Sequence, residues 1–107
     1  MTVRIQHVVT GGPAGDRRCT AVVDEADGTL VEVVAGADTA AEVTITLAHA
    51  DAPAVLGGSV SLDVAYMQGR VKVAGDPAAV LRVLELSPAP SWEPVRAGVA
   101  AALEITA

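Results

Sequence analysis

The stretch from Ala65 to Asp76, Ala-Tyr-Met-Gln-Gly-Arg-Val-Lys-Val-Ala-Gly-Asp, decides how the chain around it folds. Gly69 can end a helical turn, because it has no Cβ to oppose a left-handed conformation. Residues 70–74 alternate polar and apolar side chains, as in a strand with one buried face. Asp76 and Pro77 suit the N-cap and the first position of a helix. The stretch therefore predicts a helix end, a strand and a helix start in succession.

Patterns on both sides of this stretch predict the remaining elements. Alternating or β-rich segments predict strands, and apolar residues spaced three or four apart predict helices. Four strands, then two short helices, a fifth strand and further helices are typical of an α+β structure with helices on one face of a sheet. The expected strands are 2–10, 17–25, 29–34, 42–48 and 70–74, and the expected helices are 51–56, 61–67, 77–86 and a last one capped by Ser91.

The segment Tyr66-Met-Gln-Gly-Arg-Val-Lys-Val-Ala-Gly-Asp76 resembles the signature of the sterol carrier protein 2 family, which comprises small lipid-transfer domains. In that family the same pattern links a short helix to the last strand and then to a helix. Residues 41–48 and 54–58 resemble the strand and helix that come before it, and residues 78–86 the helix after it. The resemblance spans roughly residues 17–87. It implies a five-stranded mixed or antiparallel sheet, helices on one face, and an apolar tunnel between the two layers.

Length and composition limit the possible functions. The 107 residues suit one domain, 1–107, and no apolar run is long enough to predict stable membrane insertion. Without a secretory leader pattern and with Cys19 as the lone cysteine, the expected location is cytoplasmic. The net charge of −6, with one Trp, one Tyr and no Phe, argues against nucleic acid as a partner.

The residues that carry reactive or metal-binding groups form no recognisable motif. His7, His49 and Cys19 lack the spacing of a zinc site. Asp24, Glu25 and Asp27 flank an Asp-Gly hairpin turn and lack the further ligands of a calcium loop. The glycine-rich segment 11–15 leads into a strand and lacks the ending of a phosphate-binding loop. We therefore expect no catalytic residue, metal or cofactor, and a protein that is not an enzyme.

The resemblance implies an apolar ligand, such as a fatty acyl chain, acyl-CoA or sterol-like lipid, held between sheet and helices. A second interpretation is an interaction module with a closed cavity, in which Tyr66 and Met67 fill the core and Gln68 is a loop residue. That module would act as a homodimer or with a partner enzyme. The residues expected to border the ligand are Val55, Leu56, Tyr66, Met67, Gln68, Val80, Leu81 and Leu84.

Family members generally carry a helix before the first strand, whereas this sequence reads as a strand from Thr2. Apolar surface left uncovered would then need another partner. On the last predicted helix, Trp92, Val95, Val99 and Leu103 form a stripe at helical spacing. We expect a homodimer with this helix at its interface, and packing of the stripe within one chain is the alternative.

Overall fold

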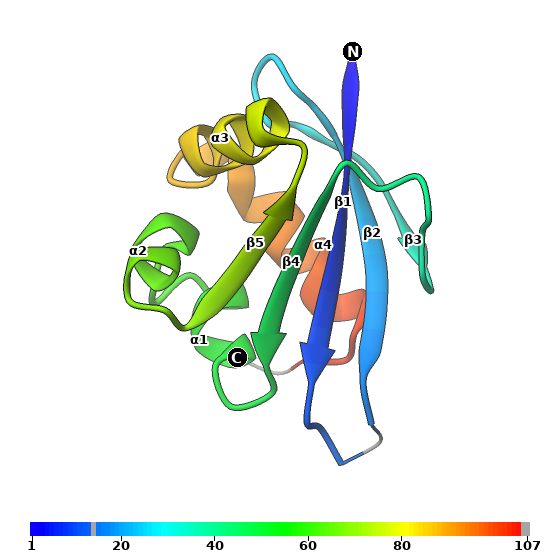
Figure 1. The fold of residues 1–107 in the computed structure, drawn as a ribbon, viewed down its shortest axis with the longest axis vertical. Coiled ribbons are helices and arrows are strands. Elements are labelled where there is room, and N and C mark those ends of the chain that lie inside the picture. The colour runs from blue at the N-terminus through cyan, green and yellow to red at the C-terminus, as the bar shows by residue number, and fades with distance from the viewer. Residues whose placement is uncertain (14, 106–107) are drawn as a thin grey trace.

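Five strands form one mixed sheet in the order β3-β2-β1-β4-β5, as the computed structural model, which describes residues 1–13 and 15–105, shows in Figure 1. β1 runs antiparallel to β2 and parallel to β4, and the outer pairs β2–β3 and β4–β5 are antiparallel. The predicted five-stranded sheet is therefore confirmed. The strands are β1 (Thr2–Thr10), β2 (Arg17–Asp24), β3 (Leu30–Ala35), β4 (Val43–Ala48) and β5 (Val71–Gly75).

The helices complete an α+β architecture. In Figure 1, α4 lies behind the sheet, where it packs against β2 and β3, and α1 packs against α4. The helices α2 and α3 flank β5, which joins them in the chain. The helical elements are α1 (Ala52–Leu56), α2 (Leu62–Met67), α3 (Pro77–Leu86), the 3-10 turn η1 (Pro90–Trp92) and α4 (Glu93–Ala102).

The acidic cluster predicted to flank a hairpin does so. Gly28 has a positive φ of 78°, and the Asp27 carboxylate accepts a hydrogen bond from the Thr29 amide at 2.9 Å. That backbone hydrogen bond lowers the pKa of Asp27. The side chain of Asp24 accepts from the Ala26 amide in the same way. These acids shape the turn between β2 and β3.

Gly75 and Asp76 determine how β5 ends and α3 begins. The Asp76 amide donates to the Glu42 carbonyl at 3.0 Å, and its carboxylate accepts from the Ala79 amide at 3.1 Å, which confirms the predicted N-cap of α3. Gly75 has φ of 140°, and a Cβ there would overlap the carbonyl oxygen of Glu42. Only glycine therefore lets β5 approach β4 closely enough for α3 to begin where it does.

The loop from β3 to β4, residues 36–42, covers part of the face opposite the helices and passes in front of the sheet in Figure 1. The Arg4 guanidinium donates to the Asp38 carboxylate at 2.6 Å, and the Asp38 amide donates to the Gln6 side chain at 2.9 Å. The hydrogen bond from Arg4 lowers the pKa of Asp38. Thr20 and Val22, which point to this face of β2, are buried. Both faces of the sheet are thus covered in part.

The stripe Trp92, Val95, Val99 and Leu103 is buried in the core of the single chain. The alternative, packing of the stripe within one chain, is therefore confirmed, because α4 lies across β2 and β3 and turns the stripe inward. The stripe does not supply the expected dimer interface, and a homodimer stays a prediction. Close packing there needs Gly98, where a Cβ would lie 3.0 Å from the Val33 side chain. Ser91 does not cap α4 as expected, since its hydroxyl donates to the Asp27 carbonyl at 2.8 Å.

Candidate functional site

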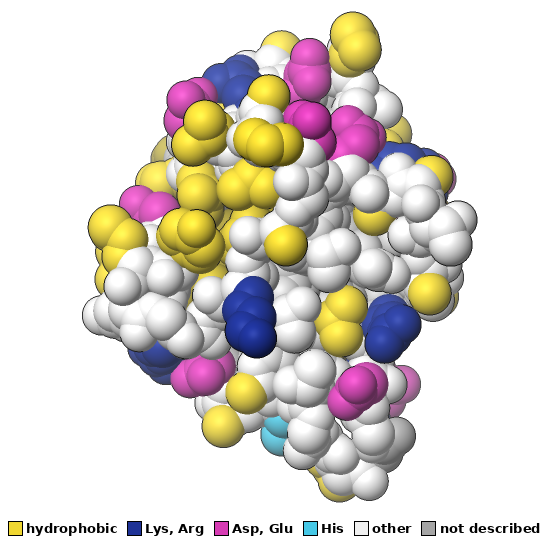
Figure 2. Space-filling view, viewed as in Figure 1, with side chains coloured by type: hydrophobic (Ala, Val, Ile, Leu, Met, Phe, Trp, Pro, Cys, Tyr) yellow, Lys and Arg dark blue, Asp and Glu magenta, His cyan; other side chains and the backbone are white. Residues whose placement is uncertain are grey.

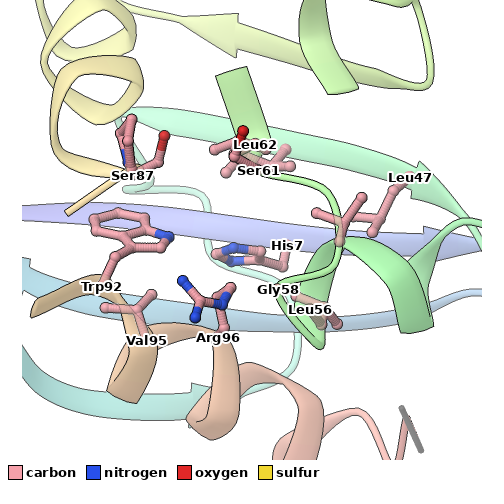
Figure 3. Close-up of a pocket in the computed structure, with 13 residues that line it drawn as sticks. His7, Leu47, Leu56, Gly58, Ser61, Leu62, Ser87, Trp92, Val95 and Arg96 are labelled. Carbon is pink, nitrogen blue, oxygen red and sulfur yellow. The ribbon is translucent and has the colours of Figure 1, made fainter. Parts of the chain in front are cut away.

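A cavity of about 190 Å³ lies between the sheet and the helices. Strands β1 and β4 form one wall, and α1, the start of α2, the end of α3, η1 and α4 form the other, as Figure 3 shows. It occupies the space between layers where the sequence predicted a tunnel. The lining residues are His7, Ile45, Leu47, Val55, Leu56, Gly58, Ser61, Leu62, Ser87, Pro88, Trp92, Val95 and Arg96.

The apolar part of the lining follows from the periodicity of the elements. On β4, Ile45 and Leu47 are two residues apart and point to the same face. On α1, Val55 and Leu56 are buried at the end of the helix. On α4, Val95 lines the cavity as part of the stripe that fills the core. These side chains give the cavity hydrophobic walls suited to an apolar ligand.

His7 is the buried imidazole of this lining. It shares the inward face of β1 with Val3, Ile5 and Val9, and its Nδ1 lies 3.3 Å from the Ile5 carbonyl oxygen. Burial lowers the pKa of His7 to about 4, and the backbone hydrogen bond to Ile5 opposes this shift in part. The ring is therefore neutral near pH 7. Sequence analysis considered His7 only as a zinc ligand, although a histidine at an inward strand position was the available signal.

Arg96 brings a cation to the cavity. In Figure 3 its side chain extends from α4 toward His7 and Trp92. The guanidinium lies against Gly58, where a Cβ would be 3.1 Å from Nη2 and 3.2 Å from Nε. Gly58 has a positive φ of 85°, so this tight turn after α1 makes room for the arginine. Sequence analysis did not assign Arg96 to the site, because its neighbours on α4 are mostly small apolar residues.

Three further polar side chains border the same space. Ser61 precedes α2 as its N-cap residue but makes no side-chain capping hydrogen bond. The Ser87 hydroxyl donates to the Leu84 carbonyl at 3.2 Å. The indole of Trp92 lies beside the cavity, which places an N–H donor among the lining groups. Together with His7 and Arg96, these groups give an apolar cavity a polar side.

The eight residues predicted to border the ligand differ in whether they line the cavity. Val55 and Leu56 line the cavity. Val80 and Leu84 are half-buried and pack against the core, but they lie outside the lining. The others, Tyr66, Met67, Gln68 and Leu81, are exposed.

The orientation of α2 explains why the signature residues do not line the cavity. This helix turns Leu62 and Ala65 inward, three residues apart, so the residues at its end point outward. Met67 is 75% exposed. The prediction that Tyr66, Met67 and Gln68 border the same enclosed space as Val55 and Leu56 does not match this cavity.

Exposed hydrophobic side chains instead form an outer surface on α2 and α3. We call Val64, Tyr66, Met67 and Leu81 the α2–α3 surface. Figure 2 shows hydrophobic side chains gathering over α3 and toward α2, at the upper left of the molecule. Exposed apolar groups that lie together are a feature of interaction surfaces.

The described residues offer no obvious reactive centre. Within residues 1–13 and 15–105, no three His, Cys, Asp or Glu side chains gather as metal ligands would. Burial raises the pKa of the Cys19 thiol to about 11, so this cysteine is a poor nucleophile near pH 7. In the described part of the chain, every helix is too short or too polar to cross a bilayer.

Comparisons with known proteins place this fold among lipid-transfer domains. The model of the SCP-2 sterol transfer family matches residues 4–86. The comparison with curated proteins found no match.

Solved structures share the fold at low sequence identity. The palmitated SCP2L2 from Aedes aegypti is 19% identical over 80% of this chain and 72% of its own, with a TM-score of 0.63. The sterol carrier protein domain 2 of Helicoverpa armigera is 20% identical over 83% and 68%, with a TM-score of 0.61. A conserved hypothetical protein, possibly sterol carrier protein, from Thermus thermophilus is 18% identical over 97% and 70%, with a TM-score of 0.62.

Proposed function

Because the chain belongs to the SCP-2 sterol transfer family, we propose that it binds an apolar ligand in the cavity between its sheet and helices and carries it without chemical change. The supporting observation is a cavity with aliphatic walls and a polar side, enclosed by both layers of the fold. Such a site can bury an apolar chain and orient its head group.

Within that class, the size of the cavity favours a single acyl chain over a sterol-like lipid. An apolar cavity of roughly 150 Å³ is known to hold benzene. By that measure, about 190 Å³ accommodates a chain of roughly seven or eight carbon atoms. A sterol ring system is larger and would need the helices to move. The solved Aedes aegypti relative is described as palmitated, which also favours an acyl chain.

The expected affinity is moderate. Burying about eight methylene groups contributes roughly 6 kcal/mol at 0.8 kcal/mol each. Lost translational and rotational freedom and ordering of the chain offset part of this gain. We therefore expect dissociation constants between roughly 50 micromolar and a few millimolar for an eight-carbon ligand.

Trp92 offers a direct measurement, because it is the single tryptophan of the sequence and lines the cavity. Titration with octanoate and with palmitate, followed by Trp92 emission, should give a saturable change. Calorimetry of the same titrations reports binding independently of the fluorophore.

Two serine variants test whether the ligand binds in the cavity or on the nearby surface. Ser61→Phe should fill the cavity and abolish binding, and it sacrifices no capping hydrogen bond. Ser59→Phe, on the exposed turn two residues earlier, is the matched control and should bind like the wild type. No saturable binding by the wild type, or equal binding by the folded Ser61→Phe variant, would rule out this cavity as the ligand site.

The α2–α3 surface favours a second candidate, an interaction module that acts as a homodimer or with a partner protein. Its motivation is the exposure of Met67 and Leu81 together with Tyr66 on neighbouring helices. Sedimentation of the wild type and of a Met67→Asp/Leu81→Asp variant tests the homodimer. A wild-type dimer that dissociates in the variant would support this candidate, whereas a monomer in both would remove the homodimer.

A further inference from the structure

Arg96 differs from the arginines that stabilise the fold. Arg4, Arg70 and Arg82 form ion pairs with Asp38, Asp51 and Glu85. Within residues 1–13 and 15–105, Arg96 makes no ion pair and no side-chain hydrogen bond, although it is half-buried. Glu93, one turn earlier on α4, is exposed and forms no ion pair with Arg96, although both border an outer hollow beside α1. Placing a charge at an apolar cavity without a partner is costly, so this cation calls for an explanation.

The guanidinium lies against the turn that follows α1. Its Nε and Nη2 lie near the place where a Gly58 side chain would be, at 3.2 and 3.1 Å from an ideal Cβ. Any larger residue at 58 would push the arginine aside. Trp92 lies four residues earlier on the same helical wall, and both side chains point into the same space in Figure 3. Among the described residues the guanidinium thus has no ionic partner, and it is directed at the cavity.

The lining contains hydrogen-bond donors but no acid. Among the described lining residues, Arg96 carries the one ionised side chain, since His7 is neutral near pH 7 and neither Asp nor Glu is present. The indole N–H of Trp92 and the hydroxyl of Ser61 add donors. This contrasts with the chain as a whole, whose net charge is −6. A ligand group that complements this lining must accept hydrogen bonds and carry negative charge.

Resting on the proposed function, we propose that Arg96 binds the carboxylate of a monocarboxylic acid of roughly seven or eight carbons in all, whose short apolar chain fills the rest of the cavity. The planar guanidinium matches a carboxylate with two parallel N–H···O bonds. The chain extends from this head toward Leu47, which lies across the cavity in Figure 3. The ligand is therefore an ionised fatty acid rather than a neutral lipid.

Two ligands with the same chain and different heads test this assignment. Octanoate and 1-octanol are titrated into the wild type and into Arg96→Gln at about pH 7.5, where a carboxylic acid is ionised. The wild type should bind octanoate more tightly than octanol. In Arg96→Gln the ratio of the two affinities should fall by about 10- to 100-fold, because a charged hydrogen-bond pair is lost, while octanol binding should change less than about threefold.

Two further variants control for charge and geometry. Arg18→Gln removes the same charge from an exposed position on β2 and should leave the affinity ratio unchanged. Arg96→Lys keeps the charge without the planar fork and should retain only part of the preference. Urea unfolding of each variant reports whether the fold is intact.

The outcomes separate this inference from the carrier proposal. If octanol binds the wild type as tightly as octanoate, or if Arg96→Gln keeps the preference, the carboxylate assignment fails while the apolar cavity stands as a ligand site. If neither octanoate, octanol nor palmitate binds the folded wild type, both proposals fail.

Discussion

The cavity and the α2–α3 surface both take residues from α2, yet they differ in what surrounds their apolar side chains. Leu62 faces the cavity, where His7, Ser61 and Arg96 lie nearby. Met67, at the other end of the same short helix, is exposed. Hydrophobicity alone therefore does not separate a ligand site from an outer surface. The polar groups that interrupt the hydrophobic lining distinguish the cavity.

The largest effect is expected at the end of β5, the strand that joins α2 to α3. Gly75→Ala would place a methyl group against the Glu42 carbonyl and hold an alanine at a positive φ. It should therefore lower the free energy of unfolding by more than about 4 kcal/mol or prevent folding. Gly69→Ala, at φ of 74° with open space around it, should cost only about 1–2 kcal/mol. Urea unfolding measures both. Equal losses in the free energy of unfolding would mean that the cost of the Gly75 substitution comes from backbone strain and not from the close approach of β5 to β4.

A matched pair of leucine truncations compares the two regions directly. Leu47→Ala, in the buried lining, should lower the free energy of unfolding by roughly 2–5 kcal/mol, because it removes core contacts and enlarges the cavity. Leu81→Ala, where the side chain is 63% exposed, should cost less than about 0.5 kcal/mol. If urea unfolding gave similar losses, the α2–α3 surface would have to be covered in solution.

The pH dependence of stability sharpens the contrast through His7. Its pKa in the folded chain is about 4, below the ordinary histidine value of 6.5, so the unfolded chain binds more protons between these values. Its contribution is complete above pH 6.5 and is lost as pH falls toward 4, by roughly 2–3 kcal/mol. Urea unfolding from pH 7 to 4 should show a smaller loss in His7→Gln than in the wild type.

An exposed histidine supplies the control for that experiment. His49→Gln should retain the wild-type dependence, since His49 lies outside the core. Parallel curves for the wild type and His7→Gln would contradict the burial of a neutral imidazole at the cavity.

The smallest effect is expected on the outer surface. Met67→Asp should change octanoate affinity by less than about twofold and stability by less than about 0.5 kcal/mol, because the carboxylate stays in water. Calorimetry and urea unfolding check the two values. Loss of octanoate binding in a stably folded Met67→Asp protein would show that the ligand contacts the α2–α3 surface after all.

Much of the fold could be predicted because its signals are local. The Asp27-Gly28 turn, the alternation along β4 and the cap at Asp76 each depend on residues close in sequence, and each is present in the structure. The path of the β3–β4 loop over the sheet face was not predicted, because it depends on the contact of Asp38 with Arg4, 34 positions away.

The site was harder to predict, because its residues lie far apart in the sequence. Val55 and Leu56 were identified, whereas His7 and Arg96 come from opposite ends of the chain and meet only in the tertiary structure. The signature around Met67 resembled that of lipid carriers, but sequence similarity does not fix the rotation of a short helix about its axis. Two inward contacts, at Leu62 and Ala65, determine that rotation here.

The placement of β1 between β2 and β4 has a consequence for the route by which the chain folds. β2 joins β1 through a short loop, whereas β4 joins it across a wide separation, as the 38 positions between Arg4 and Glu42 illustrate. Closing the longer loop is entropically slower. Until β4 arrives, β1 exposes a strand edge that can pair with another nascent chain. Refolding yield should therefore fall as protein concentration rises, even if the native protein shows no such tendency.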